Sequence, residues 1–257
     1  MSYDHVARVR SRDLRGLDGW SGAPSAYTSL VAMGRVFVTG NLSPGRLYMI
    51  DPTQPSGPVT TVASDLGANP TGIAFDGARI WTANSGGSVS IVTPGSAPPF
   101  SVTTVASGFS SPSGIVFDGH SVWIADLGLG ALLKLDANGA ILQTIPVGPH
   151  PGFPTFDGES LWLPDAVLQS VTVVRASTGE TVATLTGNGL AGPLSAAFDG
   201  RRVLIAGSSL SLWKAADLSP LGFVDVSAQS QGAIVGVCSD GIDFFVTFLA
   251  TNGLTRF

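Results

Sequence analysis

The chain repeats itself with a period of about 41 residues, and this repeat limits its fold more than any other feature of the sequence. The segment that begins at Pro70 reads PTGIAFDGARIW, and the segment that begins at Pro112 reads PSGIVFDGHSVW. Further copies begin at Pro151 and Pro193, and two weaker copies surround Asp240 and Phe37. The anchoring glycines are separated by 43, 42, 39, 42 and 41 residues; they are Gly34, Gly77, Gly119, Gly158, Gly200 and Gly241.

Each copy predicts a set of short antiparallel strands. In the copy at Pro70, residues 71–75 alternate as an inner strand, Asp76-Gly77 forms a hairpin turn with glycine at positive φ, and residues 79–83 form the second strand. A third strand is expected at 89–92, and residues 59–63 are the outermost strand of the preceding copy. The sequence therefore predicts an all-β fold, a six-bladed β-propeller of four-stranded antiparallel blades in a single domain, 1–257.

The two ends of the repeat predict how the ring closes. The last copy stops at Phe257, after its expected third strand at 253–257. Residues 5–10 alternate between apolar and polar side chains and precede the first full copy, so they form a strand with no blade of their own. Because an open ring would leave unpaired strand edges, we expect this N-terminal strand to complete the last blade.

Two aromatic columns recur at a fixed phase of the repeat. We expect these side chains to pack one blade sheet on the next, with carbohydrate stacking as the lesser alternative. The columns are Phe75, Phe117, Phe156 and Phe198, and Trp81, Trp123 and Trp162.

Charge and hydropathy exclude several classes of function. The net charge is −5 and the pI is near 5.0, which argues against a nucleic-acid surface. The one basic run, from Arg8 to Arg15, contains Asp13 and is interpreted as a solvated strand face, with a nucleic-acid arm as the lesser alternative. No apolar run is long enough to span a membrane. We expect a monomer that binds neither nucleic acid nor membrane.

The chain start and its cysteine content bear on location. The sequence lacks an apolar secretory signal, so it predicts a cytoplasmic protein. A signal removed from the chain would leave the same sequence, so export stays an open alternative. Cys238 is the single cysteine, and we expect it to be a buried thiol without an intrachain disulfide.

The run PTGIAFDGARIWTAN and its continuation SVSIV at 88–92 resemble the bacterial NHL and YVTN-type propeller repeats. That superfamily includes virginiamycin B lyase and the gluconolactonase-like enzymes. The resemblance covers nearly the whole chain and implies a fold, since the superfamily contains lyases, lactonases, protein-binding modules and surface proteins.

The active-site residues of these enzymes do not carry over. The streptogramin lyases use histidines and a glutamate in a metal-assisted elimination, yet no Glu-x-His or His-x-His occurs here. The lactonases bind a divalent cation through a Glu, an Asp and an Asn within Asn-Gly-Leu. Asn188 and Asn252 begin such triplets, but both lie at expected blade turns, and we interpret them as coincidence.

One column of the repeat varies in an informative way. The residue three positions after the tryptophan column is Asn84, Asp126 and Asp165 in three successive copies. Oxygen donors from neighbouring blades would suit a polyhydroxylated ligand or a divalent cation, Ca²⁺ or Mg²⁺, at one end of the central channel. The alternative is that Asn and Asp start tight turns by bonding their own backbone.

His150 lies in the proline-rich segment VGPHPGFP, which enters the fourth inner strand. We expect this frame to present the imidazole toward the same end as Asp165, where a group that titrates near neutral pH could act as a general base. The alternative is a surface or hydrogen-bonded histidine. His120 follows a turn at the opposite end and should not cooperate with it.

Three hypotheses follow for the function. The first is a soluble propeller that binds a small molecule or a protein partner through Asn84, Asp126, His150 and Asp165 at the channel mouth. The second is a metal-assisted lyase or lactonase-type hydrolase that uses the same end. The third is a structural propeller module from a larger protein.

Overall fold

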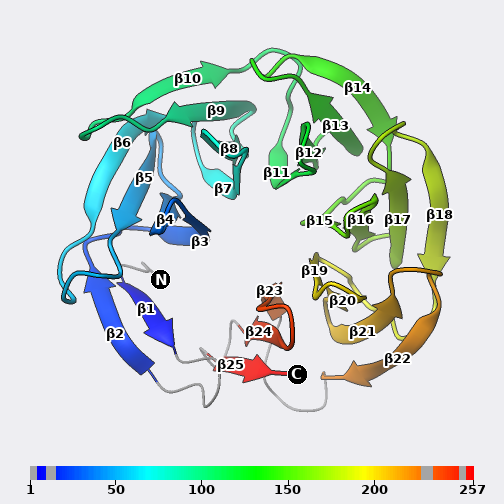
Figure 1. Cartoon of the computed structure of the whole chain (residues 1–257). Helices are drawn as coiled ribbons and strands as arrows, with labels where there is room; N and C mark the ends of the chain where they lie inside the picture. The colour runs from blue at the N-terminus through cyan, green and yellow to red at the C-terminus, as the bar shows by residue number, and fades with distance from the viewer. Residues whose placement is uncertain (1–4, 10–15, 227–233, 249–252) are drawn as a thin grey trace. The chain divides into compact units, whose positions relative to one another are not determined.

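The structure, a computed structural model, describes residues 5–9, 16–226, 234–248 and 253–257. Every regular element in these ranges is a β-strand, and the strands form the all-β six-bladed propeller that the repeat predicts (Figure 1). Within the same ranges no helix has the length and hydropathy needed to cross a membrane.

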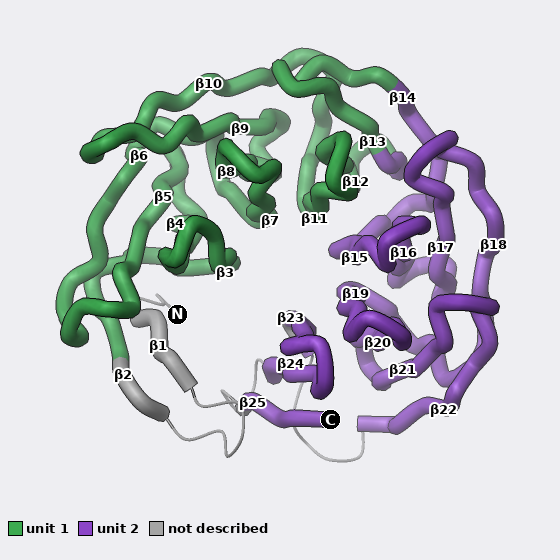
Figure 2. Tube along the Cα trace, viewed as in Figure 1, with its two compact units in different colours: residues 1–129, 133–142 green, residues 130–132, 143–257 purple. Residues whose placement is uncertain are grey.

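The chain divides into two compact units (Figure 2). The first contains residues 1–129 and 133–142, and the second contains residues 130–132 and 143–257. The division passes through the third blade.

The first unit begins with β1 (His5–Val9) and β2 (Gly16–Ser21), which pair with each other in an antiparallel sheet. The first blade has the order β3 (Ala26–Ala32), β4 (Arg35–Gly40), β5 (Gly45–Ile50) and β6 (Thr60–Leu66). The second blade has the order β7 (Pro70–Phe75), β8 (Ile80–Asn84), β9 (Ser88–Thr93) and β10 (Ser101–Val105). The third has the order β11 (Pro112–Phe117), β12 (Val122–Asp126), β13 (Ala131–Leu135) and β14 (Ile141–Pro146).

The second unit continues the same pattern. Its first full blade has the order β15 (Thr155–Phe156), β16 (Ser160–Asp165), β17 (Ser170–Arg175) and β18 (Thr181–Thr186). The next has the order β19 (Ser195–Phe198), β20 (Arg202–Ala206), β21 (Ser209–Lys214) and β22 (Pro220–Asp225). The last sheet consists of β23 (Ile234–Ser239), β24 (Phe244–Phe248) and β25 (Gly253–Arg256).

The strands agree closely with those expected from the repeat. The three strands predicted after Pro70 are β7, β8 and β9, and the strand predicted at 59–63 is β6, which extends to Leu66. The N-terminal strand predicted at 5–10 is β1 as far as Val9, and residue 10 lies outside the described residues. β1 pairs with β2, and the last sheet has three strands in the described part of the chain. Completion of the last blade by β1 stays a prediction.

The hairpin turns carry an unexpected side-chain clamp. Gly77 has φ of 96° with open space around it, so this turn requires glycine for its backbone conformation rather than for lack of room. Asp76 Oδ1 accepts the amides of Ala78 and Arg79 at 2.9 and 2.7 Å. Its Oδ2 accepts the indole Nε1 of Trp81 at 2.7 Å. The same indole bond, also of 2.7 Å, occurs in two further blades, at Asp118–Trp123 and Asp157–Trp162.

The clamp changes its donor where the tryptophan is missing. The fifth blade has Leu204 in the tryptophan column. Arg202 Nε donates to Asp199 Oδ2 at 2.6 Å, as Arg79 Nε donates to Asp76 Oδ2 at 3.0 Å beside the indole. Oδ1 of Asp199 still accepts the amides of Arg201 and Arg202. The aspartate is therefore satisfied in both versions of the turn.

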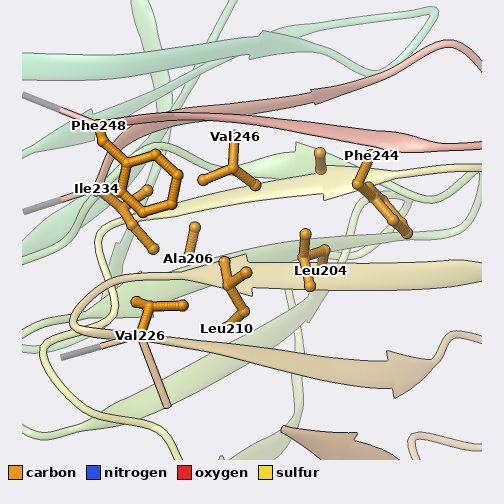
Figure 3. Packing of buried hydrophobic residues seen from close by; sticks show 9 residues of the cluster. Leu204, Ala206, Leu210, Val226, Ile234, Phe244, Val246 and Phe248 are labelled. Carbon is orange, nitrogen blue, oxygen red and sulfur yellow. The ribbon is translucent and has the colours of Figure 1, made fainter. Parts of the chain in front are cut away.

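The core lies between successive blade sheets, as the aromatic columns predict. Trp81, Trp123 and Trp162 are each 0% exposed, which confirms that they pack in the interior. Phe75 and Phe198 are half-buried against neighbouring apolar clusters. Figure 3 shows the cluster between the last two sheets; its labelled members are Leu204, Ala206, Leu210, Val226, Ile234, Phe244, Val246 and Phe248. Cys238, expected to be buried, is exposed: Val237 of the same strand packs against this cluster, and successive side chains of a strand point to opposite faces.

The first strands of successive blades contact one another within each unit. In the first unit, Thr28 Oγ1 donates to the Thr71 carbonyl at 3.0 Å, and Thr71 Oγ1 donates to the Ser113 carbonyl at 3.2 Å. A side chain at Gly72 would collide with the same Ser113 carbonyl. In the second unit, the Ala196 amide donates to the Phe153 carbonyl at 3.2 Å. These bonds fix the spacing of neighbouring blades.

Candidate functional site

Three polar side chains end the second strands of successive blades. Asn84 ends β8, Asp126 ends β12 and Asp165 ends β16, and all three are buried, with at most 1% of each residue exposed. Asn84 and Asp126 belong to the first unit, and Asp165 belongs to the second together with His150. Burial of a carboxylate is costly unless it is hydrogen-bonded, so the partners of each group decide what it can do.

Asp126 is held entirely by backbone amides. Its Oδ2 accepts the Ser110 amide at 2.9 Å, and its Oδ1 accepts the amides of Ser111 at 2.9 Å and Leu129 at 3.1 Å. The serines lie in the segment that enters β11, whereas Leu129 lies in the turn that follows β12. The carboxylate therefore ties the entry of the blade to the exit of its second strand.

Asp165 repeats this arrangement in the next blade. Its Oδ2 accepts the His150 amide at 2.9 Å, and its Oδ1 accepts the amides of Val167 and Leu168 at 2.9 and 2.8 Å. The entry segment lies so close that a side chain at Gly148 would collide with Oδ2. The contact between Asp165 and His150 thus runs through the histidine backbone.

Asn84 forms a side-chain network instead. Its Oδ1 accepts the Thr82 hydroxyl at 2.9 Å, and its Nδ2 donates to Ser88 and Ser90 at 3.1 and 2.9 Å. The Ser90 hydroxyl also accepts the amide of Gly67, in the segment that enters β7, at 3.0 Å. The asparagine therefore joins the same two parts of its blade, with serine as intermediary.

The column is thus a repeated structural clamp. Each carboxylate directs both oxygens toward amides of its own blade, which agrees with the turn-forming alternative for this column. Across the described ranges, no three His, Cys, Asp or Glu side chains lie close enough together to hold a metal ion. Binding of a ligand by Asn84, Asp126 or Asp165 stays a prediction.

His150 differs from the column because its hydrogen bonds to the blade come from its backbone and not from its side chain. Its amide donates to Asp165 and its carbonyl accepts the Ala166 amide at 3.3 Å. The imidazole Nδ1 is buried and has no hydrogen-bond partner among the described residues. Pro149 and Pro151 flank it, and Pro151 bridges to Asp165. The frame is rigid, as expected from the sequence, and leaves one buried nitrogen without a partner.

His120 occupies a different environment. It is exposed in the turn before β12, where its amide donates to Asp118 at 2.7 Å. This turn precedes Val122 and Asp126 ends the same strand, so the two residues lie at opposite ends of β12. His120 is therefore separated from the polar column of its own blade, as predicted.

Two features of these clamps were not predicted from the sequence. Besides the local amides, Asp126 and Asp165 accept amides from segments 15 or 16 residues upstream, which no local motif marks. The bond between each turn aspartate and the tryptophan five residues later was also missed. The constant spacing of these two residue types is the signal that could have revealed it.

The fold matches known propellers, whereas the sequence matches no described family. No protein-family sequence model matches the chain, and comparison with curated protein sequences gives no match. A solved structure of a catalytically inactive histidine variant of virginiamycin B lyase from Staphylococcus aureus, with quinupristin, is similar over 98% of this chain and 87% of that one. Its TM-score is 0.78 at 15% sequence identity.

A second solved structure gives the same result for the fold. The WD40 β-propeller domain of Doa1 is similar over 98% of this chain and 88% of that one, with a TM-score of 0.73 at 14% identity. Since both identities are low, these similarities concern the fold and not the activity. By its fold, the chain is similar to known β-propellers.

Proposed function

We propose that the chain is a binding propeller, which holds a small molecule or a protein partner. In the second unit the partner binds where β16 ends, at His150 and Asp165, and in the first unit Asn84 and Asp126 mark the equivalent strand ends of their own blades. The observation that carries this proposal is the buried Nδ1 of His150, which has no hydrogen-bond partner among the described residues. A buried polar atom without a partner costs about 1–3 kcal/mol, and a ligand that bonds to it would recover that cost.

The polar column supports this role indirectly. Asp165 fixes the His150 backbone through one hydrogen bond of 2.9 Å, and the flanking prolines restrict it further. A binding group held by rigid surroundings loses little conformational entropy when the ligand binds. In this proposal Asp165 positions the histidine, and Asn84 and Asp126 shape the equivalent segments of their own blades.

Two alternatives use the same fold. A metal-assisted lyase or lactonase is favoured by the similarity to virginiamycin B lyase, in which a variant with one histidine replaced is catalytically inactive. A structural module of a larger protein would need no ligand at this end. Metal analysis of the purified chain distinguishes the metal-assisted enzyme from the binding propeller. A stoichiometric Ca²⁺ or Mg²⁺ that leaves on chelation would favour the enzyme.

The binding proposal is tested by a fragment screen followed by amide nuclear magnetic resonance. We expect some polar fragments to shift the amide resonances of His150 and its neighbours in the parent chain. The matched control is His150→Phe, which keeps a planar ring and removes both ring nitrogens, and it should lose these shifts. Fragments that bind both proteins equally, or no binding fragment at all, would favour the structural module.

A further inference from the structure

The fourth blade, formed by β15 to β18, departs from the repeat around Asp165. In the described part of the chain, three buried side-chain polar atoms have no hydrogen-bond partner: His150 Nδ1, Ser170 Oγ and Ser195 Oγ. The first two belong to residues that adjoin Asp165, since the His150 amide bonds to its carboxylate and Ser170 pairs with it across the sheet. A buried polar atom without a protein partner calls for something bound beside it.

Ser170 lies on the same face of the sheet as the Asp165 carboxylate. The two residues are directly opposite in the antiparallel pair of β16 and β17, which places their Cβ atoms about 4.5–5.5 Å apart. Thr172, two residues further along the same face, donates its hydroxyl to the Val147 carbonyl at 3.5 Å. The segment that carries His150 therefore crosses the face on which Asp165 and Ser170 lie.

The corresponding position in other blades either uses its hydroxyl or has none. In the second blade, Ser88 Oγ accepts a bond from Asn84 Nδ2 at 3.1 Å. In the third blade, Ala131 follows Asp126 by the same five positions that separate Ser170 from Asp165. In the fifth blade, the Ser209 hydroxyl donates to a backbone carbonyl. The repeat therefore does not require the unpartnered hydroxyl of the fourth blade.

The turn that follows Asp165 exposes two large apolar side chains. Val167 and Leu168 are 62% and 54% exposed, although Asp165 Oδ1 accepts the amides of both. The corresponding turns of the second and fifth blades contain only glycine and serine, at 85–87 and 207–208. The fold of the turn therefore does not need these apolar groups, and the carboxylate holds them in fixed positions at the surface.

Leu168 also covers the segment that leads to His150. A side chain at Gly148 would meet both Asp165 Oδ2 and Leu168 Cδ1, so the leucine lies over the glycine beside the carboxylate. His150 itself is half-buried. Rotation of the Leu168 side chain would open this segment to a small ligand without movement of the backbone.

Asp165 gives this end of the second unit a negative charge that no neighbouring cation balances. The amides that bond to its carboxylate stabilise the ionised form and leave its charge in place. Apart from Asp165, the segments at this end of β15 to β21 contain no Asp, Glu, Lys or Arg; they are residues 145–156, 164–174, 186–197 and 203–211. Asp225 ends the outer strand β22 of the next blade and adds a second acid. The local charge therefore favours a cationic ligand.

An ammonium group matches the atoms around Asp165. It carries three N–H donors. Three acceptors lie near one another: Ser170 Oγ, Nδ1 of a neutral His150, and Asp165 Oδ2, which accepts one amide in the described structure. An alcohol would offer one donor, and a carboxylate would be repelled by Asp165.

We propose that the fourth blade binds a small amphipathic amine, with its ammonium group among Asp165, His150 and Ser170 and its alkyl chain on Val167 and Leu168. This inference rests on the binding role proposed for His150 and specifies the class of the ligand. The departures of this blade from the repeat would then supply the two halves of one site.

The test is an amide nuclear magnetic resonance titration of the full chain with hexylamine, propylamine, 1-hexanol and hexanoate. At about pH 8 both amines are protonated and hexanoate is ionised. We expect hexylamine to shift the amides of His150, Val167 and Leu168. It should bind about tenfold more tightly than hexanol or hexanoate, and about tenfold more tightly than propylamine because its longer alkyl chain buries more apolar surface.

Two substitutions test the two halves of the site. Ser170→Ala, which reproduces the alanine of the third blade, should weaken hexylamine binding about fivefold and leave the melting temperature unchanged. Val167→Ser should reduce the difference in affinity between hexylamine and propylamine. The matched controls are Ser208→Ala, in the corresponding turn of the fifth blade, and Val224→Ser, at a valine that is 46% exposed. Both controls should bind like the parent.

The possible failures are distinguishable. Hexanol or hexanoate binding as tightly as hexylamine would overturn the ammonium assignment. Unchanged affinity in Ser170→Ala, or a clear loss of stability in that variant, would remove this hydroxyl from the site. If no amine binds but other fragments shift the His150 amide in the parent and not in His150→Phe, this inference fails while the binding role of His150 stands. If no fragment binds either, the binding role fails as well.

Discussion

At the scale of the residue, the turn aspartate performs two tasks at once. One oxygen of Asp118 accepts the amides of His120 and Ser121, and the other accepts the Trp123 indole at 2.7 Å. The turn and the largest buried side chain of the blade are thereby held by one carboxylate. This explains why Asp-Gly recurs with tryptophan five residues after the aspartate.

The indole bond of the third blade can be measured by a double-mutant cycle. Trp123→Phe keeps an aromatic ring in the core but leaves Asp118 Oδ2 without its donor, which should cost about 1–3 kcal/mol of unfolding free energy. Asp118→Asn removes the charge at the same bond. Urea unfolding of both single variants and the double variant should give a coupling energy of about 0.5–3 kcal/mol. Additive effects would show that the bond contributes nothing beyond ring burial.

The turn aspartates also predict how stability depends on pH. Burial opposes the charged form of Asp76, but the Trp81 indole, the Arg79 and Ala78 amides and the Arg79 guanidinium outweigh it and lower its pKa. Because the pKa is lower in the folded chain than in the unfolded chain, Asp76 stabilises the fold above the unfolded value of about 3.9. That contribution is lost as the pH falls through the folded pKa.

The measurement is the melting temperature of the parent and of Asp76→Asn between neutral pH and about pH 2.5. The parent should be the more stable protein at neutral pH, and the difference should shrink below about pH 4. A difference that does not change with pH would contradict the role of the charged carboxylate.

At the scale of the element, the repeat predicts those strands whose partners lie within the same copy. β7, β8 and β9 follow one another through short turns, so residue alternation and the Asp-Gly signal are sufficient to place them. β2 was not predicted, because it pairs with β1 outside any copy of the repeat. The repeat period therefore does not predict strand pairs that form outside a single copy.

The candidate site was predicted in position but not in its bonding. The sequence places Asn84, Asp126 and Asp165 at the ends of second strands, where the structure has them. It does not reveal that backbone amides from an earlier segment occupy both carboxylates, since an amide is present at every residue except proline. Whether His150 Nδ1 is buried and has a hydrogen-bond partner depends on how the side chains pack, and this could not be inferred from the sequence.

The clamp at the end of β16 predicts an asymmetry between two aspartates. Asp165 accepts backbone amides with both carboxylate oxygens, so the side-chain NH₂ of Asp165→Asn would face a backbone N–H. This should lower the free energy of unfolding by about 1.5–3 kcal/mol. Asp136 accepts two amides through Oδ1 alone, so Asp136→Asn should stay within about 0.5 kcal/mol of the parent. Chemical unfolding of the two variants checks this, and equal costs would contradict the clamp.

The predicted role of the N-terminal strand has a simple test. If β1 completes the last blade, deletion of residues 1–11 should expose a strand edge and lower the melting temperature by several degrees or cause aggregation. Calorimetry of the parent and the shortened chain provides the measurement. An unchanged melting temperature would count against this closure.

At the scale of the whole molecule, the propeller fold is compatible with many functions, so function must be argued from its sites. The polar groups of the blades mostly serve the repeat: the turn aspartates hold the tryptophans, and the column at the strand ends holds the entry segments. His150 Nδ1 is a buried nitrogen in a rigid segment that the blade does not use. We therefore propose a mainly structural role for the polar column and a binding role for His150.

The most direct test of this assignment is the unfolding free energy of His150→Phe. If the imidazole is kept for a ligand, replacing it with an apolar ring removes a buried unpartnered nitrogen, and the stability should be equal to that of the parent or higher. Functional groups of this kind are often retained at a cost in stability. A loss of more than about 1 kcal/mol would show that the imidazole stabilises the fold, and would contradict its assignment to binding.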